Sequence, residues 1–374
     1  MKLALAEIRR RRGRWGSIIG AVGFIVFLVL VLAALADGLF IGTAGALQTG
    51  DSDALVYSID GRRSLVRSEL PLSDLAEVAA VDGVADVGAL GVLLATATAG
   101  GDSFDIAVMG HIPGHAGEPT QLVEGRRPAP DEQFVAVADV SLQDQGISLG
   151  DSVTLTDSSQ PVVIIGLVEN AQYLLAPTVW VPMGTWQALR VEVRPETTGR
   201  GPVAQAFPIL LEPDTTVASV GTAIDQALGT TETVSKDEAI LSLPGVDQQR
   251  STFTAIIVVS FVVVGIVISL FFALITLEKR GQFAILKAIG SSNRFLLQGV
   301  LVQAIIATVA GYVVGWGLSR LLALALPGSV PVEFLTGTAL SLFAATVLMG
   351  AVGALFSFRR IIRIDPAAAL GGEA

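Results

Sequence analysis

Two histidines are the side chains in this sequence best suited to bind a metal ion or to transfer a proton. His111 and His115 lie in the stretch MGHIPGH, and a spacing of four residues can place two ligands on one face of a helix. Pro113 and Gly114 lie between them and disfavour a helix there, and no third ligand is evident. The sequence therefore predicts a solvated loop here and no metal site.

Other patterns that would support catalysis are missing from the sequence. Neither histidine lies in a nucleophile-elbow motif, and no G-x-x-x-x-G-K-[ST] motif is present to bind the phosphates of ATP. The acidic pairs at 131–132 and 237–238 adjoin turns or helix starts and are expected to be solvated. Because the chain has no cysteine, thiol redox chemistry, iron–sulfur clusters and cysteine metal sites are excluded. We expect no catalytic residue, bound cofactor or metal ligand in this chain.

Long apolar segments make up much of the remaining sequence. Hydrophobic residues account for 52% of the 374 residues and charged residues for 16%, and the mean hydropathy is +0.66. Four segments are almost free of charge, namely 15–36, 251–277, 295–326 and 334–358. As a helix, even the shortest would extend about 33 Å, which is enough to cross a hydrocarbon core of about 30 Å. The sequence predicts an α-helical membrane protein with four transmembrane helices, arranged as one plus three.

The first apolar segment also has features of a secretory signal, because arginines precede it and the Ala-Leu-Ala at 34–36 resembles a cleavage site. Its 22 residues exceed the roughly 7–15 residues of a signal h-region. Gly16, Gly20 and Gly23 also place small residues along one helical face, which favours helix packing over cleavage. We expect a retained membrane helix.

Charge placement predicts which side of the membrane each segment occupies. Basic residues are concentrated in 1–14, 278–294 and 359–374, and cytoplasmic segments are enriched in Lys and Arg. Segment 37–250 carries 29 acidic and 10 basic residues, a net charge of −19, and would lie outside the cytoplasmic membrane. The negative charge of the chain therefore belongs to its exterior domain, and we expect no nucleic-acid partner.

The exterior segment 37–250 is expected to fold as a large α+β domain, because predicted strands and helices interleave without a regular βαβ period. The predicted strands are 54–59, 104–110, 134–138, 152–156, 161–168, 178–182 and 207–212. The predicted helices are 72–80, 184–190, 215–228 and 236–243. The stretch 197–202, rich in Gly and Thr, is either a boundary between two lobes or a hairpin loop. Only the short outer loop 327–333 joins the last two spans.

Small and polar residues mark contacts between the predicted membrane helices. Gly311, Gly315, Gly350 and Gly353 indicate close helix packing, either within one subunit or between the two subunits of a dimer. Arg320 is ionisable within a span and close to its outer end. It is expected to reach the outer headgroups or to pair with Glu333 across the short loop.

The segment 276–295 between the second and third spans has the pattern of an amphipathic helix. On a helical wheel its apolar residues Phe283, Ile285, Leu286 and Ile289 fall within one arc of about 160°. Gly290 is suited to end this helix, and Ser291 or Ser292 to cap the next one. An apolar face at the membrane surface must be covered by lipid headgroups or by another protein. Both possibilities remain open on periodicity alone.

Three stretches of the sequence resemble a known family. LEKRGQFAILKAIGSSNRFLLQGVLVQ (277–303) resembles the signature of MacB/FtsX-type permeases of ABC transporters, and FSFRRIIRIDPAAAL (356–370) looks like their C-terminal ending. In the exterior domain, LVEGRRPAPDEQFVAVA is followed by ISLGDSVTL and PVVIIGLVE, an order similar to the family's MacB-like periplasmic core. The first span looks most like those of the HrtB and DevC-like subgroup.

The resemblance implies a permease subunit that works as a dimer, either with itself or with a paired permease, and with a separate ABC ATPase that binds ATP and Mg²⁺. Segment 278–294 would be the coupling helix that docks in a groove of the ATPase, and ATP-driven closure of the dimer would be relayed to the exterior domain. By the resemblance, the contact residues would be Glu278, Arg280, Phe283, Leu286, Lys287 and Gly290.

The subgroup resemblance would make haem a candidate substrate, but haem iron requires ligands such as His, Met, Tyr or a carboxylate. The first two predicted spans contain none of these, and Tyr312 and Met349 are the candidates in the later spans. Efflux or extraction of another hydrophobic or amphipathic molecule therefore remains open. A further alternative is a membrane regulator whose exterior domain signals to an extracellular protein partner without transport.

Overall fold

The computed structural model describes residues 12–99, 101–199, 201–327 and 330–362. Most of the predicted basic N-terminal segment and most of the predicted cytoplasmic tail lie outside these residues, as does the family-like ending at 363–370. The chain divides into two compact units, one formed by Met1–Gly38 with Ser251–Ala374 and the other by Leu39–Arg250. This division agrees with an exterior domain inserted between the first and second spans.

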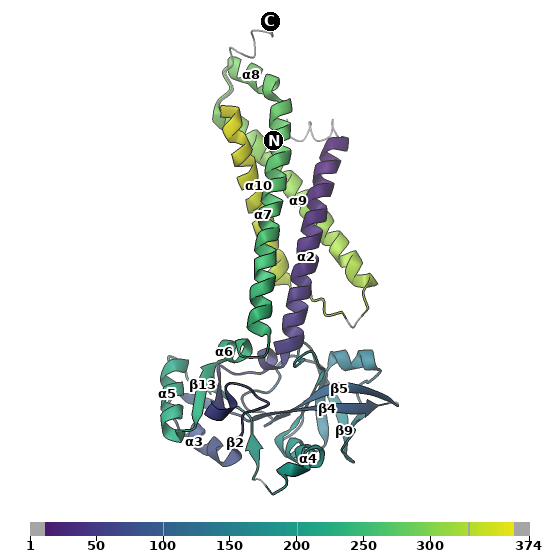
Figure 1. Ribbon diagram of the computed structural model, residues 1–374, viewed down its shortest axis with the longest axis vertical. Helices are drawn as coiled ribbons and strands as arrows, with labels where there is room; N and C mark the ends of the chain where they lie inside the picture. The colour runs from purple at the N-terminus through teal and green to yellow at the C-terminus, as the bar shows by residue number, and fades with distance from the viewer. Residues whose placement is uncertain (1–11, 100, 200, 328–329, 363–374) are drawn as a thin grey trace. The chain divides into compact units, whose positions relative to one another are not determined.

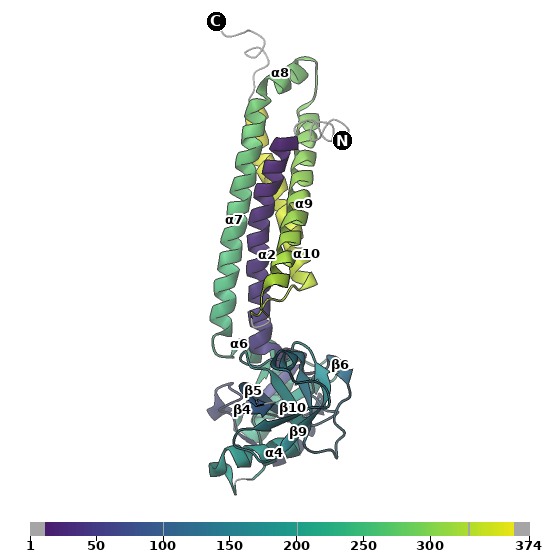
Figure 2. The ribbon, with the colours of Figure 1, turned by 90° about the vertical axis from the view of Figure 1, so that its right-hand side faces the viewer.

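The first unit is a bundle of long helices. Its helices are α2 (Arg12–Thr49), α7 (Val246–Glu278), the short α8 (Arg280–Ala288), α9 (Asn293–Ala325) and α10 (Thr336–Ile362). The four long helices run side by side in this unit (Figures 1 and 2). Among the residues that the structure describes, these four are long and apolar enough to cross a membrane. The predicted four spans in a one-plus-three arrangement are confirmed.

Each of the four long helices extends beyond its predicted span at one end or both, and α2 and α7 do so by the most residues. The first was predicted to end at residue 36, but α2 continues to Thr49, and the second begins at Val246 instead of residue 251. Asp37 and Gly38 indicate a helix end by composition, because Asp and Gly are weak helix formers. The additional turns of α2 are held by tertiary contacts within the second unit, which a local pattern does not report.

The second unit contains most of the β structure. Its strands are β1 (Ala54–Ser58), β2 (Leu70–Pro71), β3 (Val84–Val87), β4 (Leu90–Ala99), β5 (Asp102–His111), β6 (Leu122–Gly125), β7 (Val135–Asp139), β8 (Ser152–Leu155), β9 (Pro161–Val168), β10 (Thr178–Pro182), β11 (Val203–Ala204), β12 (Phe207–Leu211) and β13 (Thr231–Ser235). Its helices are α3 (Leu75–Ala79), α4 (Met183–Val193), α5 (Val217–Leu228) and α6 (Lys236–Leu241). Each predicted strand and helix of this segment is confirmed; β9 and β10 have the predicted ends, and the other elements have shifted ends.

The strands of the second unit form two main sheets. The larger has the order β6-β9-β7-β10-β5-β4-β8, in which β10 pairs with β5 and β7 with β9 in parallel and the other pairs are antiparallel. The smaller has the order β13-β1-β12-β3. The mixed pairing confirms an α+β domain. The stretch 197–202 does not divide it into lobes, since all of Leu39–Arg250 forms one unit.

The larger sheet is buried on both faces, because alternate residues of a strand point to opposite sides. On one face, Ile106 and Val108 of β5 belong to a core that also contains Trp186 of α4. The indole of Trp186 packs so closely on β4 and β5 that only glycine fits at Gly91 and Gly110. On the other face, Ala107 and Met109 belong to a core that contains Ala44, Ala46 and Leu47 from the end of α2.

The last turns of α2 are held by the loop 170–176 through backbone hydrogen bonds. Ala46 donates its N–H to the carbonyl of Gln172 at 2.8 Å, while Gly42 and Thr43 accept from Leu175 and Leu174. Gly45 permits this contact, because a Cβ there would lie 2.4 Å from the Asn170 carbonyl oxygen. Leu174 and Leu175 both adopt left-handed backbone angles, with φ of 51° and 67°, a cost that these hydrogen bonds offset.

Candidate functional site

The short helix α8 has two faces with different surroundings. Phe283 packs against the buried core of the helical bundle, and Ala284 is only 1% exposed. Further around the same apolar arc, Ile285, Leu286 and Ile289 are 52%, 38% and 79% exposed. The predicted apolar arc is therefore divided between them. Phe283 supports the bundle, whereas Ile285, Leu286 and Ile289 form an outer apolar face, which we call the α8 outer face.

Both ends of α8 are fixed by local structure. Lys279 alone separates α7 from α8, and Gly290 follows the helix with a left-handed φ of 96°. The hydroxyl of Ser292 accepts a hydrogen bond from the N–H of Phe295 and so caps α9, as the sequence predicted. The segment between α7 and α9 therefore consists of a one-residue connection at Lys279, the helix α8 and a tight turn at Gly290.

The charged residues predicted to contact a partner have neighbours within the bundle. Glu278 forms an ion pair with Arg14 of α2, and the ammonium of Lys279 lies 3.4 Å from the amide oxygen of Gln303 in α9. Lys287 is half-buried. The side chain of Arg280 is outside the part of the chain that the structure describes.

Glycines bring α2 and α9 into close contact. A Cβ on Gly315 would lie 2.7 Å from the carbonyl oxygen of Gly23, and one on Gly23 would lie 3.1 Å from the carbonyl oxygen of Gly311. Gly350 of α10 lies against Thr308 of α9, and Gly353 of α10 against Ser269 of α7. All of these contacts are within one chain.

Gly16 and Gly20 behave differently from the other glycines. A Cβ on either would meet nothing within 4 Å among the described residues, and both positions are exposed. They therefore contribute nothing to the packing of this bundle. Their predicted role in contact with a second subunit stays a prediction.

Arg320 lies over aromatic rings. Its guanidinium carbon is 4.6 Å from the centroid of the Phe334 ring and 5.6 Å from that of Trp316. These are cation–π distances, and they hold the arginine at the end of α9 next to the start of α10. The N–H of Glu333 donates to the carbonyl of Ala34 in α2. The Arg320–Glu333 pair stays a prediction.

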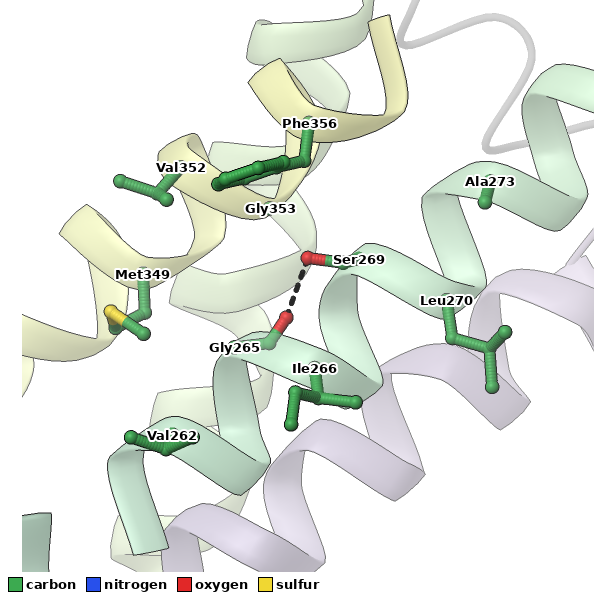
Figure 3. Close-up of a pocket in the computed structure, with 10 residues that line it drawn as sticks. All are labelled: Val262, Gly265, Ile266, Ser269, Leu270, Ala273, Met349, Val352, Gly353 and Phe356. Carbon is green, nitrogen blue, oxygen red and sulfur yellow. Dashed lines mark hydrogen bonds between the residues drawn. The ribbon is translucent and has the colours of Figure 1, made fainter. Parts of the chain in front are cut away.

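An apolar groove of about 660 Å³ lies between α7 and α10. Figure 3 shows its lining, in which the hydroxyl of Ser269 donates to the carbonyl of Gly265 at 2.7 Å. The described residues that line it include no titratable side chain, and the thioether of Met349 is the one atom there able to ligate haem iron. The hydroxyl of Tyr312, the other candidate ligand, donates to the carbonyl of Ala339.

The two histidines do not lie together in a solvated loop, so that prediction is wrong for His111. Strand β5 continues to His111, whose ring is 1% exposed and lies edge-on to Trp180 at 5.8 Å. His115 is exposed and lies 2.8 Å from Asp86. Among the residues that the structure describes, no group of three or more potential ligands could hold a metal ion.

His111 has an acidic neighbour in Glu118. Its Nε2 lies 3.8 Å from a carboxylate oxygen of Glu118, too far for a hydrogen bond. Burial raises the pKa of Glu118, but the adjacent His111 ring, the N–H of Gly114 and the guanidinium of Arg127 outweigh burial and lower that pKa below its ordinary value. Glu118 is thus held as a carboxylate inside the domain.

Comparisons with known proteins agree with this architecture. The FtsX-like permease C-terminal family matches residues 254–366, which include most of α7 and all of α8, α9 and α10. An uncharacterized ABC transporter permease of Mycobacterium tuberculosis is 27% identical over 371 residues, covering 99% of both chains. A protein of Staphylococcus haemolyticus, named as a proposed hemin transport system permease, HrtB, is 23% identical over 372 residues, covering 100% of this chain and 99% of its own.

Two solved domains each match about half of this chain. The periplasmic region of MacB from Actinobacillus actinomycetemcomitans matches with a TM-score of 0.39 and 17% identity, over 51% of this chain and 91% of its own. The extracellular domain of YknZ from Gram-positive bacteria matches with a TM-score of 0.37 and 19% identity, over 50% and 99%.

The bundle of four helices, the inserted α+β domain and the two relatives agree with one another. Residues 254–366 match the FtsX-like permease family, and the chain as a whole is similar to ABC transporter permeases.

Proposed function

We propose that this permease relays ATP-driven movements of a separate ATPase to its exterior domain and thereby expels or extracts a hydrophobic or amphipathic molecule. In this proposal α8 docks in a groove of the ATPase, and both chain termini lie in the cytoplasm, where ATP is available. Two permease subunits close together when the ATPase binds ATP, and α2 and α7, which lead into the exterior domain, carry that movement outward.

The α8 outer face carries the proposal. Ile289 is 79% exposed, and Ile285 lies one turn before it on the same side. Exposed apolar side chains grouped at the end of a helical bundle are typical of a protein or membrane contact. The half-buried Lys287 and the exposed Arg294 add positive charge to the same segment, and polar residues beside an apolar centre are typical of a protein interface.

Replacing Ile289 tests this docking. We expect Ile289→Asp to remove most of the ATPase from the purified permease, because a carboxylate would be desolvated in an apolar contact. An interface residue of this kind contributes about 2 kcal/mol or more, roughly a thirtyfold loss of affinity. Ala288→Asp is the matched control, since it adds the same charge to the same helix at an exposed position beside the α8 outer face.

Two outcomes distinguish docking from a lipid contact. If Ile289→Asp releases the ATPase and Ala288→Asp does not, α8 is the docking helix. If both variants retain the ATPase and its rate of hydrolysis, the α8 outer face contacts lipid and the proposed docking is wrong.

The substrate can be tested with the purified complex. The name of the Staphylococcus haemolyticus relative makes hemin the first molecule to try, and Met349 and Tyr312 are the residues that could ligate its iron. We propose an apolar or amphipathic substrate without requiring haem, because the groove between α7 and α10 is apolar. Stimulation of ATP hydrolysis by lipids, lipopeptides and hemin identifies the class. A flat Soret band after addition of hemin would remove haem from the candidates.

A further inference from the structure

The connection between α7 and α8 is too short to let the two helices move independently. Lys279 is its single residue, and the backbone hydrogen bonds continue through it, with the Lys279 N–H donating to Ile275 and the Phe283 N–H donating to Lys279. Helix α8 therefore cannot move far without moving the end of α7. The position of α8 depends on what holds this connection.

The side chain of Lys279 ties this connection to α9. Lys279 is 8% exposed, its ammonium lies 3.4 Å from the amide oxygen of Gln303, and Gln303 is itself 7% exposed. Burying an ammonium costs several kcal/mol before its partners compensate. The core of the bundle is apolar and includes Phe272 of α7 and Val300 of α9, so we expect an apolar residue to be at least as stable at this buried position. Stability alone does not explain a buried lysine here.

The preceding residue ties the same connection to α2. Glu278, the last residue of α7, forms an ion pair with Arg14, which lies in the first turn of α2. The two side chains are 48% and 26% exposed, and exposed ion pairs contribute at most about 1 kcal/mol to stability. Such a pair can still fix the relative position of two helices, because it favours one register over others.

We infer that Glu278 and Lys279 are positioning residues that transfer displacement of α8 to α2 and α9, and that they are not part of the surface contacting the ATPase. Glu278 connects the short α7–α8 connection to α2, and Lys279 connects it to α9. A displacement of α8 therefore moves α7, α2 and α9 together. This inference rests on the proposed docking of the ATPase to α8. It assigns Glu278 a role different from the ATPase contact implied by the family resemblance.

Charge reversal tests the tie to α2. In the reconstituted complex with its ATPase, we expect Arg14→Glu and Glu278→Arg each to reduce permease-dependent ATP hydrolysis about 5- to 10-fold, the lower part of the range typical of coupled sites. The amount of bound ATPase should stay unchanged. The double reversal, Arg14→Glu with Glu278→Arg, restores an ion pair of opposite direction and should recover most of the loss.

A distance measurement separates transmission from folding. Because the chain has no cysteine, a spin label can be placed at the exposed Leu28→Cys in α2 of each of the two permease subunits without first removing native cysteines, and the distance between the two labels reports movement of α2. Addition of ATP should shift the label distance in the wild type and the double reversal, and not in the single reversals. Equal shifts in all four proteins, or a double reversal no better than the single ones, would overturn the inference.

Lys279→Met tests the tie to α9 with a side chain of similar length. We expect unchanged or higher thermal stability, because a buried ammonium is removed, together with loss of the ATP-dependent shift. A Lys279→Met complex that shifts normally would overturn the role of Lys279. If the wild-type permease does not retain the ATPase, or Ile289→Asp does not release it, the proposed docking fails instead of the inference.

Discussion

Glu118 is a buried carboxylate that contacts several parts of the α+β domain. It lies beside His111, accepts a hydrogen bond from the N–H of Gly114 and lies 3.7 Å from the guanidinium of Arg127. Its backbone carbonyl accepts from the N–H of Asp51, just after the end of α2. One acidic residue thus holds together a loop, a strand end and the entry of α2 into the domain.

Replacing Glu118 should change how the stability of the chain depends on pH. The folded-state pKa of Glu118 is lower than its ordinary value of 4.5, so its carboxylate stabilises the fold above that pH. The contribution is lost as the pH falls through the lowered pKa. We expect Glu118→Gln to cost about 1 kcal/mol at pH 7, the value of a hydrogen bond, and to lose less stability than the wild type on acidification.

Thermal unfolding of the full-length protein, followed by tryptophan fluorescence between pH 7 and pH 3, measures this effect. Glu124→Gln is the control, because Glu124 is an exposed carboxylate on β6. Parallel pH profiles for the wild type and Glu118→Gln would contradict the assignment.

The sequence predicted the surroundings of individual residues correctly only where neighbouring residues in the sequence determine them. Ser292 was predicted among the caps of α9 because Ser after Gly is a local signal, and the structure confirms it. His111 was predicted in a solvated loop because Pro113 and Gly114 follow it. Its burial depends on Trp180 of β10, which is 69 residues away in the sequence and adjacent only in the sheet. Contacts of this kind have no signature in a window of neighbouring residues.

At the scale of elements, periodicity predicted that α8 is amphipathic but not how its apolar arc is used. Phe283 and Ile289 both fall in the predicted arc, and only the packed bundle distinguishes the inner residue from the exposed one. Strand β4, with the sequence LGVLLATATA, was not predicted, since its small residues give a weak strand signal. It is fixed by a ten-residue antiparallel pairing with β5.

The contact between α2 and α9 makes a prediction with an internal control. A Cβ on Gly315 would lie 2.7 Å from the Gly23 carbonyl oxygen and 2.8 Å from the Phe27 nitrogen, and neither backbone atom can give way without separating the helices. We expect Gly315→Ala to destabilise the protein by about 1–3 kcal/mol. Gly317, two residues later in the same helix, meets nothing within 4 Å among the described residues.

Gly317→Ala should therefore be neutral or stabilise the protein, because alanine has a higher helix propensity than glycine. Thermal unfolding of the two variants in the same detergent compares them directly. Equal midpoints for Gly315→Ala and Gly317→Ala would show that α2 and α9 do not approach closely in the membrane.

At the scale of the whole molecule, the charge distribution predicts the membrane topology. Segment 37–250, predicted to lie outside, has a net charge of −19, while the predicted cytoplasmic segments are basic. Hydropathy predicted the four spans and the place of the inserted domain, the interleaved strand and helix patterns predicted its α+β class, and all are present in the structure. The side of the membrane on which each unit lies depends on the positive-inside rule. The proposed docking requires that α8 lie on the cytoplasmic side, because ATP is on that side.

Single cysteines test this orientation without background, since the natural chain contains none. Ser159→Cys lies at an exposed position between β8 and β9, and Ala288→Cys lies at the end of α8. A membrane-impermeant maleimide added to intact cells should label Ser159→Cys and leave Ala288→Cys unlabelled, and inside-out vesicles should give the reverse. Labelling of both cysteines from the same side would place α8 with the acidic domain. An ATPase in the cytoplasm could then not reach the α8 outer face while the acidic domain lies outside.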